Sequence, residues 1–240
     1  MEPRFNPPMH LDSTVASGGA VAERVNAFLR SVYGWMCAGL AVTAVTASFV
    51  ASSPGLVTTV ATNRLLFWGL VIAQLGIVFA LSARVDRLAA STASALFIVY
   101  SALTGVTLSL VLLAFTGESI ATTFVVTGGM FGGLALYGSA TRRDLSGLGS
   151  FMFMGLIGLI LASIVGMFWQ NDALQFLISF IGVIVFTGLT AYDAQRLKAM
   201  ALAMPAGQTG SYAVVGALAL YLDFINLFLF LLRFLGSRRD

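Results

Sequence analysis

Seven apolar segments, each close to the length of a membrane span, follow one another along the chain. A helix rises about 1.5 Å per residue and the hydrocarbon core of a bilayer is about 30 Å thick, so about 20 apolar residues cross it as a helix. The segments are continuous apolar runs, which predict helices and not the alternating strands of a membrane barrel. We expect spans near residues 31–52, 65–83, 88–115, 120–137, 148–169, 173–198 and 214–236.

Composition points to the same class of protein. Of the 240 residues, 58% are hydrophobic and 10% are charged, and the mean hydropathy is +0.93, far above that of a soluble domain. A single cysteine and a single histidine exclude a disulfide framework and a Cys/His metal cluster. The net charge of +3 is spread over short loops, which gives no support for a nucleic-acid partner. We expect an all-α membrane protein without a cofactor, with the lipid bilayer as its main partner.

Residues 1–23 combine prolines, serines and glycines without apolar periodicity, which predicts a disordered cytoplasmic tail. We therefore assign residues 24–240 to a single domain of seven transmembrane helices.

The last segment carries a carboxylate, Asp223, near its middle. An ionised Asp at that depth costs roughly 2.5–3.5 kcal/mol on insertion scales, so it normally faces protein or a water-filled cavity and is functional. Small and polar residues share its helical stripe, while Leu and Phe cover the rest. This pattern predicts that the last helix is central in the bundle. The stripe consists of Tyr212, Gly216, Ala219, Asp223, Asn226, Phe230 and Arg233.

The fourth segment contains two overlapping pairs of glycines spaced four residues apart, formed by Gly128, Gly129, Gly132 and Gly133. Small residues at this spacing allow close approach of a second helix. The pattern predicts that these glycines pack against a neighbour inside the bundle.

Lys and Arg in short loops set the orientation of a membrane protein. With seven crossings, most of them lie on the side of the amino terminus, which is therefore expected in the cytoplasm, with the carboxyl terminus outside. That side holds Arg4, Arg24, Arg30, Arg84, Arg87, Arg142, Arg143, Arg196 and Lys198, and the other holds Arg64, Arg233, Arg238 and Arg239.

Asp193 and Asp223 belong to the cytoplasmic halves of two consecutive spans joined by one loop. They can therefore face each other at similar depth. Two carboxylates a few ångströms apart in low dielectric cannot both ionise cheaply, so they share one proton. The pair is a candidate proton sensor. The alternative is that each Asp separately pairs with a basic residue or caps backbone as a packing element.

The stretches TGLTAYDAQRLK (187–198) and GALALYLDFINLFLFLLRFLG (216–236), with YSALTGVTLSLVL (100–112) and YGSATRRDLSGLG (137–149), resemble the Bax inhibitor family, and within it the bacterial branch. The resemblance implies a multi-pass protein of the bacterial inner membrane, in which six helices surround the last one. It also implies a pH-sensitive calcium leak channel with Asp193 and Asp223 as the sensor. The resemblance further implies that a basic residue at the cytoplasmic end of the second helix latches that pair. Arg84 stands at this place here, with the nearby Arg87 as the alternative.

Calcium prefers six to eight oxygen ligands. Inside the predicted bundle only Asp193 and Asp223 supply carboxylates, with Asn226 and, at the opposite mouth, Glu118 as accessory groups. This set suits transient coordination of a passing ion. A non-conducting regulator that binds a membrane protease or a stress-response partner is the alternative function.

The aspartate pair also resembles that of an intramembrane aspartyl protease, because two carboxylates sharing a proton can activate water. Such proteases require Gly-x-Gly-Asp, whereas Leu220, Tyr221 and Leu222 precede Asp223 here. We therefore do not expect an enzyme.

The loop charges predict that the two termini lie on opposite sides of the membrane. Single cysteines placed at Ser13 and Ser237 in a Cys37→Ser background should react with an impermeant thiol reagent from opposite sides. Labelling of both from one side would contradict the seven-crossing topology.

Overall fold

The computed structural model describes residues 11–169, 171–204 and 209–239, and almost all of these are helical. Seven of the helices are long and apolar enough to cross a membrane, which confirms the predicted architecture. A short helix, α2, and a single 3-10 turn, η1, connect some of them. The elements are α1 (Leu11–Ala51), α2 (Pro54–Thr62), α3 (Arg64–Ala83), η1 (Val85–Arg87), α4 (Ala90–Ala114), α5 (Gly117–Ala140), α6 (Ser146–Phe168), α7 (Asp172–Ala203) and α8 (Thr209–Leu235).

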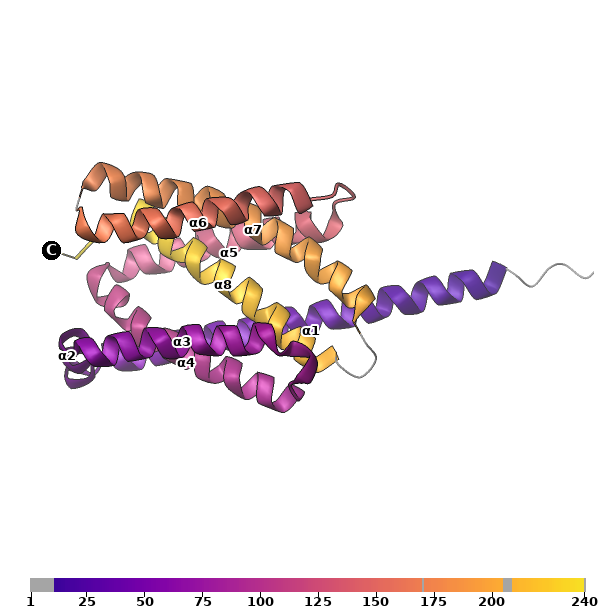
Figure 1. Ribbon diagram of the computed structural model, residues 1–240, viewed down its shortest axis with the longest axis horizontal. Coiled ribbons are helices and arrows are strands. Elements are labelled where there is room, and N and C mark those ends of the chain that lie inside the picture. The colour runs from indigo at the N-terminus through magenta and orange to yellow at the C-terminus, as the bar shows by residue number, and fades with distance from the viewer. Residues whose placement is uncertain (1–10, 170, 205–208, 240) are drawn as a thin grey trace, which may run out of the picture.

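The last helix, α8, is the most buried of the seven. In α8, 61% of the apolar 18-residue stretch that defines the span is buried inside the protein, against 6% in α3. It runs diagonally between one group formed by α1, α3 and α4 and a second group that contains α5, α6 and α7 (Figure 1). Direct packing joins it to α7, α1, α5, α4 and α3, and α6 packs mainly on α7. The prediction of a central last helix is confirmed.

The two ends of the bundle differ in their connections (Figure 1). The α3–α4, α5–α6 and α7–α8 connections lie at one end, which we call the α7–α8 end. The α4–α5 and α6–α7 connections lie at the other, which we call the α4–α5 end, together with the last described residues. Seven helices thus place the start of α1 and the end of the chain at opposite ends.

The segment after α8 is fixed to the α4–α5 connection by backbone hydrogen bonds. Thr116 N donates to Ser237 O (3.1 Å), and Arg239 N donates to Ala114 O (3.0 Å). Phe115 and Arg238 form an isolated antiparallel bridge between these bonds, and Ser237 N donates to Ser119 Oγ (2.9 Å). The segment that follows α8 therefore has a defined place as far as Arg239.

One side of α8 is locked by polar and close contacts with α1 and α4. The Tyr221 ring is fully buried, and its hydroxyl lies 2.6 Å from Thr43 Oγ1. Thr43 Oγ1 also lies within hydrogen-bond distance of the carbonyl oxygens of Gly39 and Ser101 (both 2.9 Å). At Gly39 and Gly105, a Cβ atom would collide with the facing helix, so α1 and α4 approach more closely here than larger residues would allow.

Two helical regions differ from the sequence-based expectation. Residues 11–23, for which disorder was predicted, form the first turns of α1, because extending an existing helix gains one hydrogen bond per residue. The same prediction for residues 1–10 lies outside the described residues. The second difference is α2, which was not predicted. It begins with Pro54, a residue favoured in the first turn of a helix.

The predicted packing role of the four α5 glycines is wrong. A Cβ atom built on Gly128, Gly129, Gly132 or Gly133 would meet nothing within 4 Å. The buried face of α5 is formed instead by Thr123, Thr127, Phe131, Ala135 and Gly138. The sequence spacing was compatible with close packing, but the larger residues Phe131 and Thr127 direct the other face of the helix inward. The close approach of α5 to α7 occurs at Gly138, where a Cβ would overlap the Ala191 carbonyl.

Gly138 and Gly132 therefore should respond in opposite directions to the same substitution. Gly138→Ala pushes a methyl group into the α7 backbone and should destabilise the protein by about 1–3 kcal/mol. Gly132→Ala fills open space and should leave stability unchanged or raise it by up to about 1 kcal/mol, because Ala favours the helix. Thermal unfolding in detergent measures both, and an equal loss in the two variants would contradict this assignment of the faces.

Candidate functional site

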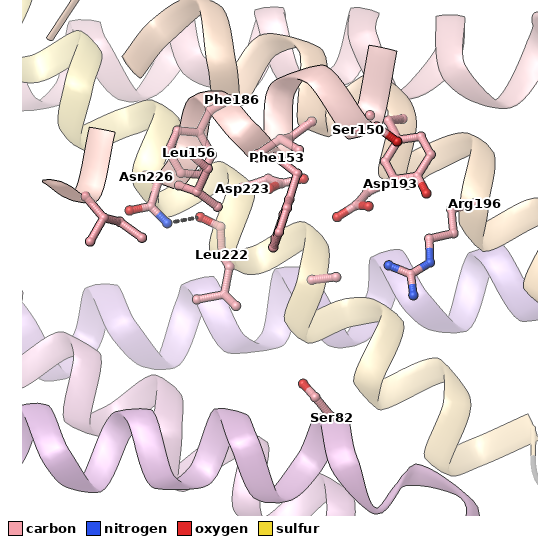
Figure 2. Close-up of a pocket in the computed structure, with 15 residues that line it drawn as sticks. Ser82, Ser150, Phe153, Leu156, Phe186, Asp193, Arg196, Leu222, Asp223 and Asn226 are labelled. Atoms are coloured by element: carbon pink, nitrogen blue, oxygen red, sulfur yellow. Dashed lines mark hydrogen bonds between the residues drawn. The ribbon is translucent and has the colours of Figure 1, made fainter. Parts of the chain in front are cut away.

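A cavity of about 790 Å³ lies between α6, α7 and α8 and reaches Ser82 on α3. Its polar lining includes Asp193 and Arg196 from α7 and Asp223 and Asn226 from α8. Figure 2 shows the two aspartates directed into the same space, with Arg196 beside Asp193 and Ser82 on the far wall. The two predicted sensor residues therefore share one cavity.

The carboxyl groups of Asp193 and Asp223 are close enough to interact electrostatically. Asp193 is half-buried, whereas Asp223 is only 5% exposed. Among the described residues, nothing forms a hydrogen bond to Asp223 Oδ2, although that atom is buried. An unpartnered buried carboxylate oxygen is costly for an ionised group and is typical of a functional position.

Small residues bring the two helices together around this pair. Ala194 and Ala217 are fully buried in the core shared by α7 and α8. At Gly216, a Cβ would collide with the side chain of Leu197 on α7. Asp223 lies one turn from both Ala219 and Asn226, and all three line the cavity. The middle of the polar stripe of α8 therefore faces α6 and α7, and the predicted inward direction of the stripe is confirmed there.

The positive charge nearest the pair belongs to Arg196, which interacts electrostatically with Asp193. Arg196 follows Asp193 by three residues, so the two share one face of α7. Arg84, the expected latch, stands exposed at the carboxyl end of α3 and does not line the cavity. Ser82 is the α3 residue that does. In this arrangement Arg84 is not brought to the pair.

The α5–α6 connection, which starts the α6 wall of the cavity, is fixed to α7 near the aspartate. Leu145 N donates to Gln195 Oε1 (2.9 Å), and Gln195 Nε2 donates to Arg143 O (2.8 Å). Asp144 Oδ1 accepts hydrogen bonds from Ser146 Oγ (2.6 Å) and Ser146 N (2.9 Å). These bonds hold the pKa of the Asp144 carboxyl below its usual value and keep it ionised at the start of α6, where a negative charge is favourable.

Several side chains that line the cavity carry oxygen atoms, but only the carboxyl groups of Asp193 and Asp223 can carry a negative charge at neutral pH. Besides the two carboxyl groups, hydroxyl groups are supplied by Ser82, Ser150 and Tyr192. Asn226 Nδ2 donates to Leu222 O (2.8 Å), which leaves the Asn226 carbonyl oxygen as an acceptor. In the part of the chain that the structure describes, no group of three or more His, Cys, Asp or Glu residues could hold a metal ion. The set can coordinate a hard cation only weakly.

Glu118 lies apart from this cavity. It is exposed in the first turn of α5, at the α4–α5 end. The structure thus brings together Asp193, Asp223 and Asn226 from the predicted site, and leaves Glu118 and Arg84 elsewhere.

Four polar lining residues were not singled out as site residues from the sequence: Arg196, Tyr192, Ser150 and Ser82. Arg196 could have been found, because the spacing of three residues from Asp193 was visible. Tyr192 and Ser150 could not have been found, since only the packing of α6 on α7 brings them to the same cavity. The Tyr192 ring lies against Gly149, where a Cβ would collide with it, so this glycine makes room for the cavity wall.

Known proteins similar to this chain agree with the architecture. Residues 25–240 match the family described as "Inhibitor of apoptosis-promoting Bax1". The inner membrane protein YbhL of Escherichia coli (strain K12) is 51% identical over 88% of this chain and 92% of its own length. A protein of Borreliella burgdorferi is 46% identical over 90% of this chain and 94% of its own, and one of Deinococcus radiodurans is 45% identical over 91% and 93%. These relatives are bacterial, and the seven apolar helices make the chain a multi-pass protein of the inner membrane. The chain belongs to the Bax inhibitor family.

Proposed function

We propose that the protein is a pH-sensitive calcium leak channel of the inner membrane, in which Asp193 and Asp223 form one proton-sharing sensor. The observation that carries this proposal is that both carboxyl groups line one cavity inside the bundle, with Asp223 Oδ2 buried and unpartnered among the described residues. Calcium is the transported ion in this proposal, and no resident cofactor or catalytic step is needed.

The sensor works through the number of protons that the pair holds. With one proton, the two carboxyl groups can form a short charge-assisted hydrogen bond between α7 and α8, and a single negative charge remains. Loss of that proton adds repulsion between like charges, and gain of a second removes the last negative charge. Either change alters the balance between two states of the bundle only by its differential stabilisation. One pKa unit corresponds to about 1.4 kcal/mol, or roughly tenfold in population.

The helix best suited to move over the pair is α3. It is the least buried of the seven helices, and its packing is mainly against α4. Ser82 already lines the cavity, and Arg84 follows two residues later at the end of the same helix. In the closed state we propose that α3 shifts toward α7 and brings Arg84 to the singly charged pair. The arrangement with Arg84 exposed corresponds to the unlatched state.

Weak coordination of Ca²⁺ in the cavity is compatible with a leak channel. Two carboxylates with hydroxyl and amide oxygens can replace part of the hydration shell of Ca²⁺, and Arg196 beside Asp193 opposes tight binding. An ion can therefore enter and leave the cavity. The amino terminus on the cytoplasmic side, as the loop charges predict, would put the cavity nearer the cytoplasm.

A second candidate function is a non-conducting regulator that binds another membrane protein, such as a protease. The observation that favours it is the outward-facing set of glycines on α5, Gly128, Gly129, Gly132 and Gly133, with open space in front of each. Small residues at this spacing on a lipid-facing surface are typical of helix association. Calcium flux of the purified protein in liposomes supports the channel, whereas a flux-silent protein that co-purifies with a protease supports the regulator.

The sensor proposal predicts that Asp193→Asn and Asp223→Asn have the same effect. Each should flatten the pH dependence of calcium entry into dye-loaded proteoliposomes from a change of roughly tenfold between pH 5 and 8 to less than about twofold. The double variant should add little, because either single substitution already breaks the unit. Wild-type pH profiles in the single variants, or effects that simply add, would show two separate structural residues.

The two arginines should differ in their effects on the same measurement. Arg196→Gln removes a cation from the side of Asp193, which favours the protonated pair and should move the midpoint of the pH profile upward by up to about one pH unit. Arg84→Gln removes only the latch, so flux should rise most at pH values where the pair holds one proton, and least where a second proton has already released Arg84. If Arg84→Gln moved the midpoint and Arg196→Gln gave the rise in flux instead, the latch would be Arg196. If Arg84→Gln behaved like the wild type, Arg84 would have no part in the mechanism.

A further inference from the structure

We propose that the α4–α5 end of the bundle holds an anionic phospholipid, with its phosphodiester between Arg233 and Arg238 and an acyl chain in the groove between α6, α7 and α8. The headgroup cavity shares no lining residue with the aspartate cavity, whereas the groove borders that cavity at Leu156, Ile160, Phe186 and Asn226. The proposal does not depend on the proposed channel function.

The headgroup part is a cavity of about 910 Å³ lined by residues of α6, α7, α8 and the segment that follows α8. Arg233 contributes from the last turn of α8, and Arg238 from the following segment. Uncharged polar groups that can donate hydrogen bonds to phosphate oxygens surround them. These are Ser163, Asn171 and Gln175; the hydroxyl group of Ser179, also in the lining, already donates to Gln175 O (2.9 Å).

Arg238 has a fixed position because its own backbone is held. The bridge between Phe115 and Arg238, with the hydrogen bonds of Ser237 and Arg239 on either side, attaches the segment to the α4–α5 connection. Arg239 is in the same segment but does not line the cavity. Neighbouring residues of an extended segment point to opposite sides, so one arginine is directed to the cavity and the next is not.

The charged side chains that line the headgroup cavity favour binding of an anion. Arg233 and Arg238 are close enough to repel each other electrostatically. Asp172 lines the same cavity, but in the described part of the chain no ion pair joins it to either arginine. Two guanidinium groups and one carboxylate leave one positive charge. A phosphodiester carries one negative charge and accepts hydrogen bonds from arginine in bidentate geometry.

An adjoining apolar groove identifies the anion as a lipid. A second cavity of about 360 Å³ shares Ser163, Met167 and Arg233 with the first. Its other lining residues are almost entirely aliphatic or aromatic: Leu156, Leu159, Ile160, Ile164, Phe186, Asn226, Leu229 and Phe230. A polar cavity with excess positive charge that opens into an apolar groove matches a phospholipid. A soluble anion would leave the groove without an occupant of matching chemistry.

The experiment measures the thermal unfolding of the full-length protein in detergent with three additives: dioleoyl phosphatidylglycerol, dioleoyl phosphatidylcholine and sn-glycerol 3-phosphate. Phosphatidylglycerol at about 100 times its Kd should raise the Tm by roughly 5–10 °C. The zwitterionic lipid and the soluble phosphate should each give less than about a third of that shift. Native mass spectrometry then counts the lipids that remain bound.

Three arginine variants and one groove variant locate the site. Arg233→Gln and Arg238→Gln should each abolish most of the phosphatidylglycerol shift, and the matched control Arg239→Gln should keep it. Ser163→Trp places a bulky ring at the junction of the two cavities, from an exposed position of α6, and should also remove the shift. The Tm of each variant without lipid shows that it is folded.

Several results would overturn the proposal. Equal shifts with both lipids would show general solvation of the apolar surface. A full shift with glycerol phosphate alone would show a soluble-anion site without a lipid. Loss of the shift in Arg239→Gln to the same extent as in Arg238→Gln would show diffuse attraction to the basic carboxyl-terminal segment.

Discussion

The structure depends on one constraint: the polar side chains of α8 must find their partners inside the protein, because lipid offers none. On the side of α1 and α4, the Tyr221 hydroxyl, Thr43 and backbone carbonyl groups form hydrogen bonds with one another. On the side of α6 and α7, Asp223 faces a cavity and a second aspartate instead. The same helix is thus fixed on one face and left with a titratable, loosely packed face on the other.

This division explains why the candidate site lies where it does. Close contacts at Gly39 and Gly105 hold α1 and α4 together, and a tightly packed region changes its arrangement only at considerable cost. Motion is cheaper where cavities already separate the helices and where α3 has few buried residues. A change of charge in the cavity therefore acts on the half of the bundle that can respond to it.

Much of the fold could be predicted from the sequence, because bilayer thickness fixes the length of an apolar span. The pairing of Asp193 with Asp223 followed from their places in consecutive helices that run in opposite directions. Predictions failed where the sequence leaves the rotation of a helix undetermined. The glycines of α5 had a spacing that suits close packing, yet only Gly138 meets a neighbour. The latch role of Arg84 stays a prediction. In this arrangement Arg196 is the arginine beside Asp193, since helix rotation and tilt decide which side chains meet.

The central position of α8 has a consequence for how the protein is made. The ribosome synthesises this helix after the six other spans, so those spans can enter the membrane before the segment that fills their middle exists. Until then the hydroxyl groups of Thr43 and Ser101 lack Tyr221, and the carboxyl group of Asp193 lacks its companion. The short bridge between Phe115 and Arg238 closes only after the segment that follows α8 has left the ribosome. The bundle is therefore assembled from the outside inward, with its innermost helix added after the six others.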